Sequence, residues 1–277
     1  MLELSSRIIM ITGGAGTLCS AAARDLAARG ARVALLGRTE AKVVALAAEL
    51  EAAGGTAIGL RVDVTNETDL KAALADVRER WGTPDVLLNG AGGKDLKALT
   101  DTVAFTTAEL DGSGTGFFNL DTAALSGEID LNIMGTVLPS RVVGAAMAAN
   151  GGGSIVNFAS MNSYRPLSRA PGYALAKAAI VNFTQWLAVY LAPANIRVNA
   201  VAPGFFVNDR SRKLLMTEDG GFSERGKQVV GHTPMGRFGE ARELVGAIRW
   251  LIDDEAAGFV TGVCVPVDGG FLACSGL

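Results

Sequence analysis

The sequence predicts an α/β protein in which one parallel β-sheet carries helices on both faces. Seven short runs recur along the 277 residues, and most are apolar almost throughout, as in strands that are covered on both faces. Longer stretches with helical patterns lie between these runs, so strand and helix alternate along the chain. We found no linker or internal repeat and expect a single domain over residues 1–277.

The expected helices carry their own start and stop signals. The stretches 17–30 and 39–55 both end on glycine, which suits a left-handed C-cap, and the stretch 65–82 opens with N-capping residues. Repeated β-α-β units of this kind form a doubly wound, Rossmann-like sheet of about seven strands. The expected strands are residues 7–12, 31–37, 56–64, 85–92, 153–160, 196–203 and 262–268.

Two segments interrupt this alternation. Residues 93–128 carry Gly/Ser/Thr punctuation and read as an insertion, and residues 204–239 are long, polar and tipped with aromatic residues. Loops of this length in a compact domain are typically lids or binding segments. Both follow the carboxyl end of an expected strand, where open α/β sheets bind ligands. We therefore expect the second segment to be a substrate loop.

Composition excludes several classes of function. The net charge of −3 gives no pull toward nucleic acid or a membrane surface. No run reaches the roughly eighteen apolar residues of a membrane span, and the apolar run near the N-terminus is too short for a signal peptide, so we expect a cytoplasmic protein. Three cysteines and the single His232 give neither a disulfide framework nor a metal-ligand cluster, and we expect no metal.

A glycine-rich turn predicts a dinucleotide site. "ITGGAGTLC" leads from the first strand directly into a helix, where backbone N–H groups and the helix N-terminus suit a pyrophosphate. Later strands end on an aspartate suited to the adenine amino group, on small residues that leave room for ribose, and on a Pro-Gly pair beside the nicotinamide. The expected cofactor contacts here are Thr12, Gly13, Gly14, Gly16, Thr17, Leu18, Asp63, Val64, Asn89, Gly90, Ala91, Gly92, Pro203, Gly204 and Phe206.

The end of the second strand bears on which dinucleotide is bound. An acidic residue there would bind the ribose 2′-OH of NAD, but this chain has Gly37 followed by Arg38. A guanidinium in place of a carboxylate suits the 2′-phosphate of NADP. The loop supplies no second cation. The sequence favours NADP(H), with NAD(H) or dual use still open.

Three polar side chains form the expected catalytic group. Tyr173 and Lys177 are four residues apart in an alanine-rich helical stretch and share one face, and Ser160 ends the preceding strand. A phenol is a poor base near neutral pH, and we expect the neighbouring ammonium, with an oxidised nicotinamide, to lower the pKa of Tyr173. Ser160 would hydrogen-bond the substrate oxygen.

The order of these motifs resembles the short-chain dehydrogenase/reductase family over essentially the whole chain. The resemblance implies a catalytic set of Ser160, Tyr173, Lys177 and Asn132, the last in "IDLNIMGT", which completes a proton relay. Tyr173 and Lys177 would also bind the cofactor. The separation of Asn132 from Asn89 is wider than usual because of the 93–128 insertion. The resemblance further implies a homotetramer, as do the apolar stretches 179–192 and 263–277.

Within that family the chain resembles the D-mannonate oxidoreductase (D-fructuronate reductase) branch. The resemblance rests on "ITGGAGTLCSA", "VNAVAPGFF", "HTPMGRFGE" and the long stretch around Tyr173, and it makes Cys19 a branch marker that packs a helix. It implies a sugar acid as substrate, whose carboxylate and hydroxyls need a cation and amide donors. The candidates for substrate contacts are Lys94, Ser160, Met161, Asn162, Arg165, Tyr173, Gly204, Phe205, Asn208 and Arg210.

Other functions fit the same residues. The substrate could be another keto-sugar acid, a polyol as in gluconate 5-dehydrogenase, or a 3-oxoacyl thioester. The fold alone also allows a non-catalytic nucleotide-binding protein. Family members of that kind tend to lose the tyrosine or the lysine, and this chain keeps Tyr173 and Lys177.

Overall fold

All seven expected strands are present in the computed structural model, and they form one parallel sheet in the order β3-β2-β1-β4-β5-β6-β7. The structure describes residues 4–5, 7–207, 212 and 214–274. The prediction of a doubly wound parallel sheet is thus confirmed. The strands are β1 (Ile8–Thr12), β2 (Arg32–Gly37), β3 (Thr56–Arg61), β4 (Val86–Asn89), β5 (Gly153–Phe158), β6 (Ile196–Pro203) and β7 (Cys264–Val267).

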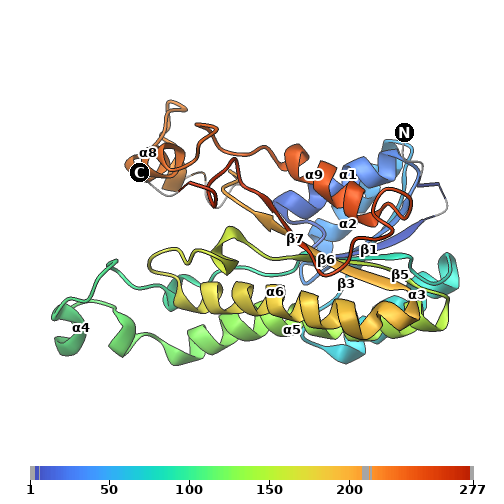
Figure 1. Cartoon of the computed structure of the whole chain (residues 1–277), viewed down its shortest axis with the longest axis horizontal. Coiled ribbons are helices and arrows are strands. Elements are labelled where there is room, and N and C mark those ends of the chain that lie inside the picture. The colour runs from blue at the N-terminus through green and yellow to red at the C-terminus, as the bar shows by residue number, and fades with distance from the viewer. Residues whose placement is uncertain (1–3, 6, 208–211, 213, 275–277) are drawn as a thin grey trace.

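Helices cover both faces of the sheet (Figure 1). One face carries α1 (Thr17–Ala28), α2 (Glu40–Ala52) and α9 (Ala241–Ile252), and the other carries α3 (Glu67–Arg80), α5 (Thr122–Ala149) and α6 (Pro171–Leu191). Each face has its own buried apolar cluster, around Leu35 and Ile248 on the first and around Leu87 and Val143 on the second. The sheet is therefore buried on both sides, which explains why its strands are apolar almost throughout.

The local signals for helix ends operate as expected. Gly30 and Gly54 follow α1 and α2 with φ of +87° and +88°, a conformation that glycine adopts without strain. The Asn66 side chain accepts hydrogen bonds from the backbone N–H groups of Thr68 and Asp69 and so caps α3. These ends fix where each strand begins and hence the register of the sheet.

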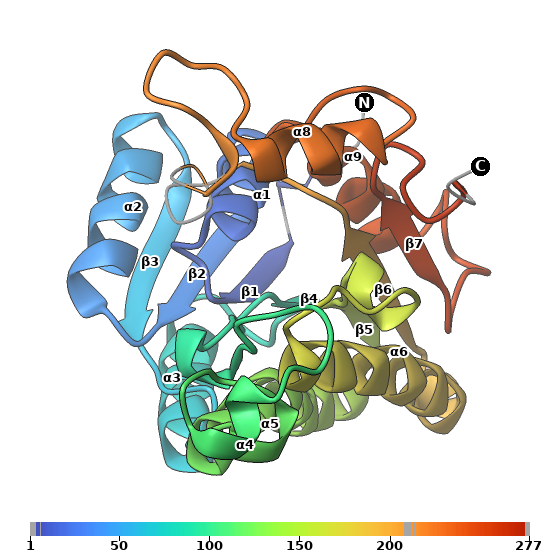
Figure 2. The same ribbon diagram turned by 90° about the vertical axis from the view of Figure 1, so that its left-hand side faces the viewer.

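The two interrupting segments lie at the same end of the molecule (Figures 1 and 2). The first contains α4 (Ala108–Asp111) and two short 3₁₀ helices, η1 (Leu96–Ala98) and η2 (Phe117–Asn119). It is shorter than expected, because the Asp121 side chain caps α5 and starts that helix at Thr122. The second segment contains α8 (Glu224–Gly231) and closes through a bridge between Phe206 and Gly239.

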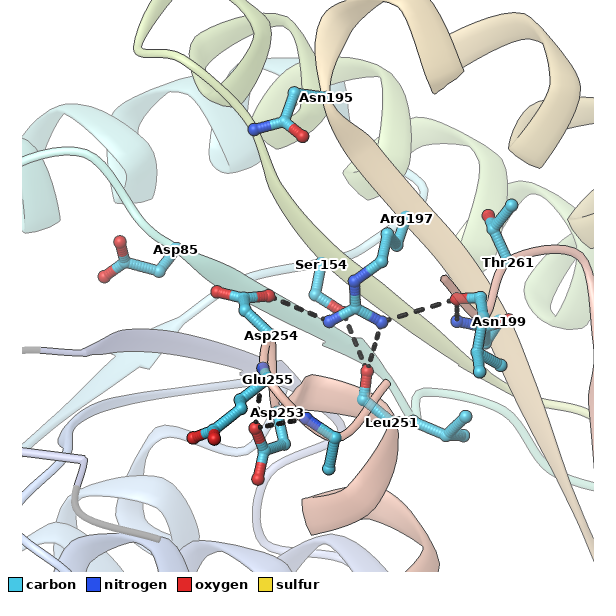
Figure 3. A network of polar contacts seen from close by, with 12 residues as sticks. Asp85, Ser154, Asn195, Arg197, Asn199, Leu251, Asp253, Asp254, Glu255 and Thr261 are labelled. Carbon is cyan, nitrogen blue, oxygen red and sulfur yellow. Dashed lines mark hydrogen bonds and ion pairs between the residues drawn. The ribbon is translucent and has the colours of Figure 1, made fainter. Parts of the chain in front are cut away.

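A polar network joins the layers near the amino ends of β5 and β6 (Figure 3). Arg197 donates to the carbonyl oxygen of Leu251 at 2.7 Å and to Asp254 at 2.9 Å, and Ser154 donates to the same carbonyl at 3.4 Å. Arg7 also pairs with Asp254. Burial raises the pKa of Asp254, but hydrogen bonds from Arg197 and Arg7 outweigh it and hold the pKa below its usual value. This network, called the Arg197 network below, ties the end of α9 to the sheet.

Two helices, Thr122–Ala149 and Pro171–Ala194, are long and apolar enough to cross a membrane by length and composition. The most apolar window of the first is 50% buried within the protein, and that of the second is 33% buried. Both belong to the layer that covers one face of the sheet, and this packing accounts for much of their apolar character.

Candidate active site

The turn after β1 forms a close-packed cradle. Gly13 has φ of +63°, and a Cβ atom there would lie 2.9 Å from the backbone of Ala91. A Cβ on Gly14 would meet Leu35 at 2.9 Å. Gly16 is the N-cap of α1, and within the described part of the chain no side chain caps this helix start. The first N–H groups of α1 are therefore suited to an anion, which fits the pyrophosphate of a dinucleotide.

Cys19 packs this cradle against the end of β4. A Cβ atom on Gly90 would collide with the Cys19 sulfur, so the two residues touch closely. Cys19 is 3% exposed, and burial raises the pKa of its thiol to about 12. A thiol of this kind is unreactive at neutral pH, in agreement with the expected packing role.

Two expected cofactor contacts, Thr12 and Asn89, hold the backbone of the site in place through their side chains. Thr12 is fully buried, and its hydroxyl accepts a hydrogen bond from the Ala91 N–H at 3.1 Å. The Asn89 amide donates to Ser140 at 2.8 Å and to Asn157 at 2.9 Å. Their side chains hold the loop after β4 in place, so direct contact of either residue with a cofactor would use the backbone.

Two guanidinium groups, those of Arg38 and Arg61, act on Asp63 in the turn after β3. β3 ends at Arg61, earlier than expected, so Asp63 lies in the following turn, where it accepts from the Thr65 N–H at 2.9 Å and hydroxyl at 2.7 Å. These hydrogen bonds lower the pKa of Asp63, and the charges of Arg38 and Arg61 lower it further. Arg61 pairs in register with Gly37. It is the second cation that the loop after β2 does not supply.

The catalytic candidates meet at the start of α6. The Ser160 side chain is close enough to the Tyr173 phenol to lower its pKa, and the Lys177 ammonium lies 5.6 Å from the centroid of the Tyr173 ring. Asn132 donates to the Gly93 carbonyl at 2.8 Å and accepts from the Gly93 N–H at 3.2 Å. These four side chains come from α5, α6 and the end of β5, and the structure brings them together.

The expected lowering of the tyrosine pKa does not follow from the chain alone. Burial raises the pKa of Tyr173 to about 12, and the charge of Glu128 adds to the rise, whereas the hydrogen bond from Ser160 opposes it. Lys177 donates to the Phe158 carbonyl at 2.7 Å, and burial lowers the pKa of its own ammonium to about 8. Desolvation thus outweighs the neighbouring ammonium.

Lys94 reaches the site from the segment after β4. Its ammonium lies 4.7 Å from the centroid of the Tyr173 ring, within cation–π range. Desolvation by neighbouring atoms and the charge of Arg225 lower the pKa of Lys94, whereas Glu128 opposes this change, although the residue as a whole is exposed. Arg225 belongs to α8, so the second interrupting segment contributes a charge that acts on Lys94 of the first. Neither Arg225 nor Glu128 was predicted from the sequence as a site residue.

Other expected substrate contacts have structural partners. Met161 and Asn162 are 2% and 4% exposed, as buried as Ser160 and Lys177, and their contact with substrate stays a prediction. The Asn162 amide donates to Ser160 at 3.3 Å and accepts from the Leu167 N–H at 2.7 Å, which fixes the Ser160 turn. Arg165 donates to the Cys274 carbonyl at 2.7 Å. Asn208 and Arg210 lie outside the described residues.

The segment after β6 borders a cavity of about 330 Å³. Phe205 packs edge-on against Phe271, with ring centroids 5.4 Å apart, and a Cβ on Gly204 would lie 2.6 Å from Asp268. Arg237 is paired with Glu243 at 2.7 Å on the cavity wall. Phe205 and Phe206 therefore line this cavity, and none of the four catalytic candidates belongs to its wall.

The chain belongs to the short-chain dehydrogenase/reductase family. The model of a family described as enoyl-(acyl carrier protein) reductase matches residues 13–272. A Bacillus subtilis protein described as an uncharacterized oxidoreductase, UxuB, is 43% identical over 275 residues, which is 99% of this chain and 98% of that protein. The protein is therefore an NAD(P)-dependent oxidoreductase, as the predicted motifs implied.

Two solved structures are similar to the chain over nearly its whole length. One, from Haemophilus influenzae and provisionally titled a D-mannonate oxidoreductase, holds NAD; it has a TM-score of 0.94 at 41% identity, over 99% of this chain and 98% of that chain. The other is a gluconate 5-dehydrogenase from Burkholderia cenocepacia with NADP and tartrate, with a TM-score of 0.83 at 27% identity over 98% and 97% of the two chains. Relatives thus bind either dinucleotide.

Proposed function

We propose that the protein interconverts a keto-sugar acid and its hydroxy acid, with D-fructuronate and D-mannonate as the substrate pair. The observation that carries this proposal is the Lys94 ammonium over the Tyr173 ring, with the charge of Arg225 acting on Lys94. Such cations suit a substrate carboxylate. The name of the Haemophilus influenzae structure supports the same substrate class.

The residues of the chain divide the remaining work. A bound nicotinamide cofactor supplies or accepts the hydride. Tyr173 donates the proton to the substrate oxygen during reduction and accepts it during oxidation, and Ser160 donates a hydrogen bond to that oxygen. Lys177 would hold the ribose of the bound cofactor and would stabilise the phenolate when it forms, and Asn132 anchors the proton path. Met161 and Asn162 keep the Ser160 turn rigid from below.

NADP(H) is the cofactor that the chain's charges favour. Arg38 and Arg61 both act on Asp63, so two guanidinium groups stand near the place where the ribose 2′-phosphate would lie. A dianionic phosphate is favoured by such a pair. Because the similar Haemophilus influenzae structure holds NAD, both cofactors belong in every assay.

A gluconate 5-dehydrogenase-like activity is the second candidate. The Burkholderia cenocepacia relative of that name was solved with tartrate, a small hydroxy acid whose carboxylates would also suit Lys94 and Arg225. A 3-oxoacyl thioester remains a third candidate, since the matching family model carries an acyl-carrier-protein name.

The deciding experiment is a substrate panel. Oxidation of NADPH and of NADH is measured with keto-uronates, keto-gluconates and a 3-oxoacyl thioester, each with wild-type protein and with Tyr173→Phe as the blank. We expect turnover of D-fructuronate, with NADPH preferred. Turnover of a keto-gluconate alone would favour the second candidate, and turnover of the thioester alone would overturn the sugar-acid assignment.

A homotetramer in the cytoplasm completes the proposal. Helix α6 exposes Leu175, Trp186, Val189 and Tyr190, and the rings of Trp186 and Tyr190 stack with centroids 5.1 Å apart. An apolar face of this kind is typical of an interface between subunits. Light scattering is expected to give four times the chain mass of 28.5 kDa.

A further inference from the structure

Glu128 is a buried carboxylate at the centre of the candidate active site. It lies on α5, one helical turn before Asn132, and is 3% exposed. A buried carboxylate that is retained in an otherwise apolar layer needs partners or a task, because removing it from water is costly. The contacts of its two oxygens show what that task is.

One oxygen of Glu128 ties down the start of the first interrupting segment. Its Oε2 atom accepts a hydrogen bond from the Asp95 N–H, next to Lys94. The position of Lys94 over the Tyr173 ring therefore depends on Glu128 through one residue of backbone. The acidic side chain acts here as a fixed point for the loop.

The other oxygen faces the first turn of α6. A Cβ atom on Gly172 would lie 3.0 Å from Oε1, and the Tyr173 N–H also favours the charged form of Glu128. Among the described residues, Oε1 has no hydrogen-bond partner within normal geometry. Its negative charge therefore lies beside the helix turn that carries Tyr173, and the donor that acts on it there, the Tyr173 N–H, falls outside normal hydrogen-bond geometry.

Polar and charged groups from several elements surround the Tyr173 phenol. Ser160 approaches from the turn after β5, Lys177 from α6 itself, Lys94 from the segment after β4 and Glu128 from α5. Arg225 of α8 acts on Lys94. Asp95 and Lys94 also face Glu128, with opposite effects on it. Glu128 is the carboxylate that acts directly on Tyr173.

We propose that Glu128 is a positioning residue: it holds the backbone beside Lys94 and the first turn of α6 in place, and its negative charge next to that turn opposes ionisation of the Tyr173 phenol. A protonated tyrosine can donate to the oxygen of a ketone, whereas only the phenolate can accept a proton from an alcohol. Glu128 therefore biases the pH range of the site toward reduction. This inference rests on the acid–base role of Tyr173 in the proposed function.

The test replaces the charge and keeps the shape. Glu128→Gln removes the negative charge but retains an oxygen for the Asp95 N–H. The matched control is Glu109→Gln, since Glu109 is 6% exposed and its carboxylate accepts from Thr106 and Phe118, both within the first interrupting segment. Tyrosinate absorbance is titrated for wild type and both variants, each against its own Tyr173→Phe counterpart so that the other tyrosines cancel.

We expect the pKa of Tyr173 to fall by about one unit in Glu128→Gln and to stay unchanged in Glu109→Gln. The basic limb of reduction and the acid limb of oxidation should move to lower pH by the same amount. An unchanged pKa in Glu128→Gln, or an equal fall in both variants, would overturn the proposal. Absence of turnover on every substrate would contradict the proposed function, whereas the absorbance titration would still test the effect of Glu128 on the pKa of Tyr173.

A second measurement needs no change at Glu128. In wild-type protein with ring-labelled tyrosine, the NMR signal of Tyr173, assigned with Tyr173→Phe, is followed through acid pH. Burial raises the pKa of Glu128, so an inflection is expected above the usual glutamate value of about 4.3. A Tyr173 signal without such an inflection would mean that the carboxylate does not act on the phenol.

Discussion

The Arg197 network and the cluster around Tyr173 contain the same kinds of charged group, but the charges are fully paired in the first and incompletely paired in the second. In the Arg197 network, Arg197 has hydrogen-bonding partners on both terminal nitrogens (Figure 3). Asp254 pairs with Arg7 as well as with Arg197. In the Tyr173 cluster, Glu128 keeps one oxygen without a close donor, and Lys94 sits over a ring with its pKa lowered. The first arrangement is electrostatically satisfied, and the second is not.

The difference has a physical consequence for each end of the sheet. Satisfied charges at the amino ends of β5 and β6 stabilise the joint between helix and sheet, and their protonation states are fixed over a wide pH range. Charges with incomplete partners at the carboxyl ends respond to a ligand or to pH, which is what proton transfer and carboxylate binding require. Substitutions in the two regions should therefore affect different measurements.

The largest expected effect comes from removing the phenol oxygen. Tyr173→Phe should lower kcat about a thousandfold in both directions, because general acid–base catalysis is lost. The free energy of unfolding should stay close to that of wild type, since the ring packing is retained. Steady-state kinetics and urea unfolding of the same preparation check both parts. A reductase rate close to wild type would exclude Tyr173 as the proton donor.

Breaking the Arg197 network should lower stability and leave catalysis unchanged, which is the reverse of the effect of Tyr173→Phe. Arg197→Met removes one donor each from the Leu251 carbonyl, the Val260 carbonyl and Asp254, and should cost about 2 kcal/mol of unfolding free energy, with kcat and KM unchanged at a temperature where the variant is folded. Arg242→Met is the control, because its pair with Glu240 is exposed and worth little. Equal losses in both variants would contradict the importance given to burial.

Removing the cation over the ring should affect substrate binding. Lys94→Met is expected to raise KM for a keto-sugar acid about tenfold, with a smaller change for a neutral polyol. Lys97→Met, an exposed lysine in the same segment, provides the matched control. If Lys94→Met raises KM equally for charged and neutral substrates, the carboxylate binds elsewhere.

The cofactor end of the site gives a more selective test. Arg61→Gln should lower kcat/KM for NADPH about tenfold and leave NADH almost unaffected, because only NADPH carries the 2′-phosphate. Arg78→Gln on the exposed side of α3 should change neither value. Parallel losses for both cofactors would show that Arg61 acts through the fold.

The smallest effect concerns stability against pH. The pKa of Asp254 is lower in the folded protein than in the unfolded chain, so its contribution is present at neutral pH and is lost as pH falls through the folded value. Asp254→Asn should lower Tm at pH 7 by about one to two degrees, a small change because the side chain is 52% exposed. The difference should shrink below about pH 4. A difference that persists at lower pH would assign the effect to packing.

The sequence predicted the fold well because the signals for it are local. Apolar runs, the caps at Asn66 and Gly30, and the glycine turn each depend on a few neighbouring residues. The spacing of Ser160, Tyr173 and Lys177 was equally readable, since one strand end and one helix face fix it.

The missed residues depend on contacts between distant segments. Arg61 lies beside Gly37 only because β2 and β3 pair in register. Arg225 reaches Lys94 only through the path of the second interrupting segment. Glu128 fell inside the expected insertion, although an acidic residue four positions before Asn132 on the same helix face was a usable signal. Conversely, the hydrogen bonds of the Asn162 amide with Ser160 and Leu167 depend on the fold of the turn after β5 and were not readable from the sequence.

The contact between Cys19 and Gly90 determines which cysteine variants the protein will tolerate. Because a Cβ at position 90 would occupy the place of the sulfur, any side chain larger than a thiol at position 19 would push the loop after β4 out of place. A cysteine-free protein for labelling work is therefore best made with alanine or serine at position 19. In the other direction, reagents that modify accessible thiols should mark Cys264 and Cys274 and spare Cys19, which makes Cys19 an internal reporter of unfolding.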